Sequence, residues 1–239
     1  MLDLVARLRR QPVGEQLAAL LERITAISEP IDDDLEIALT AWRWFLMRAA
    51  DGGIELTSAG YLKPVDVQAA AAIVPAVADW IGQHNREIQT VPLLRFRESL
   101  QRLGMLRKYK GKLVLAPAGR RYLADPAALW AALASRLVGG EVGSYQFDAG
   151  LLLLASIAGS TQDSIALQPV AMAMTGLGWR GGDGTAVRID QVPPHTIVDV
   201  EVLRNVTERA NIRRLPGTGS IEVGPLGRAL ARQALMSDR

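Results

Sequence analysis

A short segment in which a strand leads directly into a helix start occurs three times in this 239-residue sequence, at 54–62, 113–123 and 221–230. Each copy has a short strand-like stretch, a break, a glycine three residues after the break, and then an apolar position. The copies begin 59 and 108 residues apart, so their spacing does not fit a solenoid of fixed period. The repeat predicts separate small domains of one type.

The residue types at these joins suit a strand that turns into a helix. Thr57 can cap the turn after the first strand, while Pro117 and Pro225 fit a first helical position, which needs no amide donor. A glycine lets the turn pack closely against the strand. The three copies have Gly60, Gly119 and Gly227 at this position.

The segment before the second copy has the pattern of an amphipathic helix followed by a hairpin. Apolar residues at helical spacing are Leu93, Phe96, Leu100 and Leu103. Gly104 follows where a C-cap glycine belongs, and Lys110-Gly111 can form a tight turn between strands at 105–108 and 112–115. The predicted order is helix, hairpin, helix.

Three parts of this middle segment resemble winged helix-turn-helix proteins such as MarR-like regulators: 103–106, Lys110-Gly111 and 113–123. In addition, residues 53–63 together with the middle segment resemble the C-terminal region of bacterial plasmid ORF-3-like proteins, over residues 35–137. That second family has no established activity. The sequence departs from the regulator pattern at Ala116 and Gly224, where a threonine is expected; this weakens helix capping but not the fold.

These resemblances imply a mainly α fold with small β-hairpins (α+β) built of tandem winged-helix-like units. We expect an N-terminal part at 1–64, a basic unit at 65–138 and a C-terminal unit at 145–239, with a boundary near Gly139-Gly140. The predicted helices cover 14–27, 32–50, 65–83, 126–137, 147–158 and 198–210, and the helix at 65–83 is expected to be broken or kinked near Pro75. The third hairpin is expected from Ile212–Leu215 and Ser220–Val223, with its turn at 216–219.

Charge is distributed unevenly, although the net charge is only +2. Residues 91–123 contain nine basic residues against Glu98 alone, whereas residues 1–40 contain four basic and eight acidic residues. Basic side chains on a recognition helix and a wing would neutralise DNA phosphates and release counterions. The candidate nucleic-acid-binding residues are Arg95, Arg97, Arg102, Arg107, Lys108, Lys110, Lys112 and Arg120.

Two alternatives to this hypothesis remain open. The basic residues could form an ordinary solvated surface, or they could bind an acidic protein partner, the acidic N-terminal part included, with the units serving as a non-catalytic scaffold. Tandem units in one chain can also replace the dimer that is usual among regulators. We therefore expect a bacterial DNA-binding or transcription-associated protein, and alternatively a protein-interaction module.

Enzymatic, metal and membrane functions have little support in the sequence. With no cysteine and only His84 and His195, neither a thiolate metal site nor a nucleophile-and-base constellation is available, so no cofactor, metal or catalytic residue is predicted. The glycine-rich segment 176–184 lacks the spacing of a phosphate-binding loop. No signal peptide or spanning segment is recognisable, which favours a cytoplasmic location.

Overall fold

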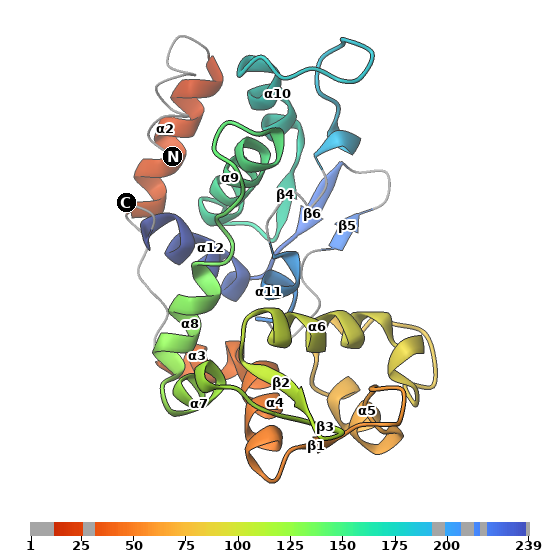
Figure 1. Cartoon of the computed structure of the whole chain (residues 1–239). Coiled ribbons are helices and arrows are strands. Elements are labelled where there is room, and N and C mark those ends of the chain that lie inside the picture. Colours follow the sequence, from red (N-terminus) through yellow and green to blue (C-terminus); the bar gives the residue numbers. More distant parts are fainter. Residues whose placement is uncertain (1–11, 26–31, 193–198, 207–212, 216–218, 238–239) are drawn as a thin grey trace. The chain divides into compact units, whose positions relative to one another are not determined.

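The computed structural model describes residues 12–25, 32–192, 199–206, 213–215 and 219–237, and these residues are mainly helical with two small antiparallel sheets (Figure 1). They form two compact units. Unit 1 contains residues from 12–25, 131–203 and 213–237, and unit 2 contains residues from 32–130 and 204–206. The expected α+β class with small hairpins is confirmed at this level.

Unit 2 begins with two helices, α3 (Asp32–Ala38) and α4 (Thr40–Ala50), followed by β1 (Ile54–Glu55). Next come α5 (Pro64–Ala71), the short 3-10 turns η1 (Pro75–Val77) and η2 (Glu87–Gln89), and α6 (Val91–Arg102). A hairpin of β2 (Leu106–Tyr109) and β3 (Lys112–Leu115) leads into α7 (Pro117–Ala124). The three strands pair antiparallel in the order β1-β3-β2.

Unit 1 contains α2 (Pro12–Thr25), α9 (Tyr145–Ala158), β4 (Ser164–Ala166), α10 (Gln168–Gly176) and η3 (Ile189–Gln191). These are followed by β5 (Arg213–Leu215), β6 (Ser220–Glu222) and α12 (Pro225–Ser237). Its sheet has the order β4-β6-β5, again antiparallel. Two helices, α8 (Pro126–Ala134) and α11 (Val200–Arg204), include residues of both units.

The two units share one chain topology: helix, strand, helix, helix, hairpin, helix, with the first strand pairing to the last. Matching residues also make matching hydrogen bonds. Leu56 N donates to Gly111 O at 2.8 Å, and Leu167 N donates to Gly219 O at 2.9 Å, so in each unit the chain just after the first strand is bonded to the glycine of the hairpin turn. The chain thus contains a structural duplication that irregular sequence spacing obscures.

The core of unit 2 is organised by aromatic side chains of α4 and α6. Trp42 and Phe96 lie edge to face with ring centroids 4.7 Å apart, and Phe45 and Phe96 do the same at 5.7 Å. All three side chains are fully buried, and edge-to-face contacts are favourable for aromatic rings. Trp42 is buried, whereas Trp44, two residues further along α4, is only partly buried.

Trp42 also anchors a segment that is distant in sequence. Its indole Nε1 donates to Asn205 O at 2.9 Å, and Asn205 Oδ1 accepts from Ala76 N at 3.3 Å. Asn205 is 1% exposed, so these bonds satisfy polar groups that lie away from water. They explain why residues 204–206 belong to unit 2.

The predicted copy at 54–62 differs from the other two. Its strand does not enter a helix: Gly60 N donates to Thr57 O, Tyr61 N donates to Thr57 Oγ1, and α5 begins only at Pro64. In addition, β1 pairs with β3 through Ile54 opposite Leu113. The expected boundary at residue 64 therefore falls inside unit 2, because the strand at 54–55 completes the sheet of the middle hairpin.

Other local predictions have mixed outcomes. The hairpin of unit 2 and the helices at α6 and α9 are confirmed within two residues of the predicted ends. The predicted helix at 65–83 ends at Ala71, ahead of Pro75, and the one at 32–50 is divided at Leu39. His195, the turn at 216–218 and the end of the helix predicted at 198–210 lie outside the described residues.

Candidate nucleic-acid interface

The solvent-exposed face of α6 has two basic side chains with an acidic side chain between them. Leu93, Phe96 and Leu100 are fully buried, which confirms the predicted apolar stripe. The exposed residues of the helix are Arg95, Glu98 and Arg102, at helical spacing on the opposite side. Two of the predicted basic residues therefore lie on one accessible face, with a carboxylate between them.

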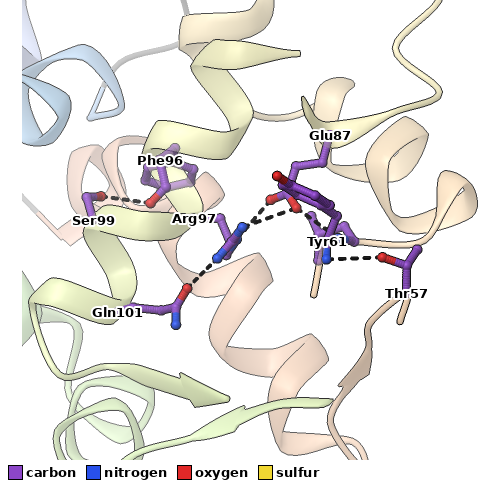
Figure 2. A network of polar contacts seen from close by, with 8 residues as sticks. Thr57, Tyr61, Glu87, Phe96, Arg97, Ser99 and Gln101 are labelled. Atoms are coloured by element: carbon purple, nitrogen blue, oxygen red, sulfur yellow. Dashed lines mark hydrogen bonds and ion pairs between the residues drawn. The ribbon is translucent and has the colours of Figure 1, made fainter. Parts of the chain in front are cut away.

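Arg97 of the same helix has a different environment. Its Nε donates to Glu87 Oε1 at 2.9 Å and its Nη2 donates to Glu87 Oε2 at 3.3 Å, while Nη1 donates to Gln101 (Figure 2). Arg97 is 2% exposed and Glu87 is 1% exposed. Glu87 also accepts from Leu62 N at 2.8 Å. We therefore leave Arg97 out of the candidate interface, because its guanidinium is buried on Glu87 and fastens α6 to η2 and the β1–α5 turn.

The hairpin presents a compact basic surface. Arg107, Lys108 and Tyr109 on the edge strand β2, and Lys110 in the turn that follows it, are all exposed. Lys110 and Gly111 both have positive φ, +45° and +74°, which is the backbone geometry of a two-residue type I′ turn. The sequence prediction of a tight turn at Lys110-Gly111 is confirmed.

Tyr109 is a functional candidate that the sequence prediction missed. Its ring is 48% exposed, with Arg107 Cζ 4.9 Å and Lys110 Nζ 5.3 Å from its centroid. Both distances are within the range of cation–π contacts, which hold the two basic side chains beside the ring. An aromatic residue inside the basic run 107–110 was the available signal, because rings interleaved with cations are typical of nucleic-acid surfaces.

Lys112 and Arg120 are partly engaged by the backbone. Lys112 Nζ donates to Gly52 O at 3.1 Å, and Arg120 Nη1 lies 3.5 Å from Leu115 O. The equivalent residue in unit 1, Arg228, donates to Val223 O at 2.8 Å across the same strand-to-helix join. The repeated position indicates that this arginine stabilises the join, so Arg120 has a structural role beside any role at the surface.

A carboxylate lies beside the hairpin turn, on the edge strand β1 that pairs with β3. Glu55 lies opposite Lys112 in the sheet register and forms an ion pair with Lys63. The hydrogen bond and the charge of Lys63, followed by the charge of Lys112, lower the pKa of Glu55 below its ordinary value. Glu55 stays ionised at neutral pH and offsets part of the positive charge of Lys63 and Lys112 beside the hairpin turn.

Searches for a metal site, a membrane span or a known relative give no positive result. Among the described residues, no cluster of His, Asp and Glu side chains could hold a metal ion, and no helix is long and apolar enough to cross a membrane. Comparison with known protein families, curated proteins and solved structures gives no match to this chain. The geometry and charge of the candidate interface are therefore the basis for a proposed function.

Proposed function

We propose that unit 2 is a winged-helix module that binds double-stranded DNA in a bacterial DNA-binding or transcription-associated protein. In this proposal α6 is the recognition helix and the β2–β3 hairpin is the wing. The observation that supports it most is the exposed basic run of the hairpin, in which Arg107 and Lys110 lie beside the ring of Tyr109 and Lys108 projects from the opposite face of β2. The sheet order β1-β3-β2 is consistent with a winged helix, as is the position of α5 and α6 between β1 and β2 in the sequence.

Each part of the surface has a distinct expected role. The wing cations would contact phosphates, which position the protein without reading sequence. Arg95 and Arg102 have the donors that recognise guanine in the major groove, and Glu98 between them can accept from the amino group of cytosine. Specificity would then come from α6 and most of the salt-dependent affinity from the hairpin.

In the sheet of unit 1, Arg213 and Arg214 occupy backbone positions equivalent to Arg107 and Lys108 of unit 2. Arg214 pairs with Ile221 in the register of unit 1, as Lys108 pairs with Leu113 in unit 2. Arg213 opposite Glu222 correspondingly matches Arg107 opposite Val114. We infer that both units descend from one type of module, and that a DNA-binding role for β2 extends as a hypothesis to β5.

The test is binding of the full chain to mixed-sequence duplex DNA, measured by fluorescence anisotropy across a salt series. Wild-type affinity should fall as salt rises, with a slope of about −0.9 in log K against log salt for each phosphate neutralised. The triple variant R107A/K108A/K110A should reduce that slope by about 3 if each residue contacts one phosphate. Arg136→Ala, an exposed arginine outside unit 2, is the matched control and should leave the slope unchanged.

One observation favours the alternative of a protein-interaction module. The chain between α5 and α6 exposes large apolar side chains, with Ile81 95%, Ile88 53% and Trp80 38% exposed. Such side chains are typical of protein-binding surfaces when they lie together. Absence of DNA binding at low salt, with a folded wild-type chain, would reject the DNA proposal and leave this alternative.

A further inference from the structure

Unit 1 contains a cavity of about 490 Å³ between α2, the end of α9, β4 and the start of α10. This volume is in the range of sites that hold small organic molecules, roughly 300–1,000 Å³. The cavity lies entirely within unit 1 and has no part in the basic surface of unit 2. Its chemistry can therefore be considered separately from DNA binding.

Small residues create this space. Ser156 on α9, Gly159 directly after α9, and Ala173 on α10 fill little volume where larger apolar residues would close the core. At Gly159 a Cβ atom would lie only 2.4 Å from Leu20 Cδ1, so the glycine also allows α2 to approach α9. The cavity is a consequence of the sequence at these positions and would be lost if they were enlarged.

The lining is apolar on one side and rich in hydrogen-bond donors on the other. Leu152, Ile165 and Val170 form the apolar part and are buried. The polar part has the Thr161 and Ser164 hydroxyls and the Arg23 guanidinium; these three residues are exposed at the mouth of the cavity, and their side chains have no partner among the residues that the structure describes. The hydroxyls of Ser156 and Ser160 donate to backbone carbonyls instead.

Among the described residues that line the cavity, none is acidic and Arg23 is the one cation. Neutral or cationic guests would leave the arginine without a counter-charge, whereas an anionic head group would receive charge-assisted hydrogen bonds from it. We propose that unit 1 binds an amphipathic monocarboxylate, with its carboxylate at Arg23, Thr161 and Ser164 and its aliphatic body against the apolar wall.

Isothermal titration calorimetry of the full chain with octanoate, below its micelle concentration, tests this proposal. Octanol serves as the uncharged analogue, and it should bind more weakly than octanoate. Arg23→Gln should weaken octanoate binding about tenfold, through loss of a charge-assisted bond, and leave octanol binding unchanged. The control Arg136→Gln removes an exposed arginine outside the cavity and should change neither affinity.

A second variant tests the apolar part of the cavity. Ala173→Leu should abolish binding of both molecules by filling the cavity, with circular dichroism confirming that the helices are retained. Failure of the wild type to bind octanoate, or equal octanoate affinities in wild type and Arg23→Gln, would overturn the proposal. Because these titrations contain no nucleic acid, their result is independent of the DNA-binding proposal.

Discussion

The buried pair of Arg97 and Glu87 makes a strong prediction about stability. Glu87→Gln retains an oxygen that can accept from Leu62 N but removes the carboxylate that is bonded to Arg97. The guanidinium would then be an uncompensated charge at a site where both side chains are at most 3% exposed. Breaking a buried pair in this way costs about 3–5 kcal/mol, a large part of the roughly 5–15 kcal/mol that holds a typical domain folded.

Urea unfolding followed by tryptophan fluorescence measures this cost, because Trp42 packs against Phe96 in the same core. Glu98→Ala, on the exposed face of α6, is the matched control and should change the free energy of unfolding by no more than about 0.5 kcal/mol. The double variant R97M/E87Q removes both charges and should recover much of the loss, since apolar replacement of a buried pair is often close to neutral.

A free energy of unfolding for Glu87→Gln within about 1 kcal/mol of the wild-type value, the range of ordinary surface substitutions, would refute the burial of Arg97. A second comparison addresses function directly. Under folding conditions, R97M/E87Q should bind DNA with the salt slope of the wild type, because Arg97 contacts Glu87 rather than phosphate. A slope of log K against log salt that is smaller than the wild-type slope by about one would indicate that Arg97 contacts a DNA phosphate.

Two glycines provide further predictions with different physical causes, both measured by urea unfolding. Gly119→Ala should destabilise unit 2 by about 1–3 kcal/mol, because the added Cβ would lie 2.1 Å from Met105 O. That carbonyl oxygen already accepts a hydrogen bond from Ala116 N. A neutral or stabilising effect would show that α7 does not approach the hairpin so closely. Gly111→Ala meets no atom within 4 Å, so its cost should be the backbone term alone, about 1–2 kcal/mol at φ +74°. Gly111→Asn should cost less, because asparagine tolerates the left-handed region, and equal costs for the two variants would contradict this explanation.

The duplication of topology gives the chain two similar modules with different surface chemistry. Unit 2 has the exposed basic hairpin around Tyr109, whereas unit 1 has the cavity between α2, α9 and α10. The joins are built alike, with Arg120 and Arg228 near carbonyls five residues earlier. We expect this common framework to tolerate divergence because the shared contacts lie at the strand-to-helix joins and not at either proposed site.

Much of the local structure was predictable from the sequence because it depends on residues close together in the chain. The apolar stripe of α6, the positive φ of Gly104 after it and the type I′ turn at Lys110-Gly111 follow from helical spacing and from backbone conformations that few residues adopt. The exposure of the hairpin cations also follows, since a short hairpin at a sheet edge has little to cover it. These features hold in whatever tertiary context the segment folds.

The tertiary structure alone decided which distant segments meet. Nothing local to residues 54–55 predicts that they pair with 112–113, and the same strand-like pattern was compatible with a separate domain. Arg97 has the residue type and helical position of a surface cation, yet its neighbours bring Glu87 to it from ten residues away and remove both from water. The energy of a charged group depends on its burial and its counter-ion, and both are set by the packing of the whole unit.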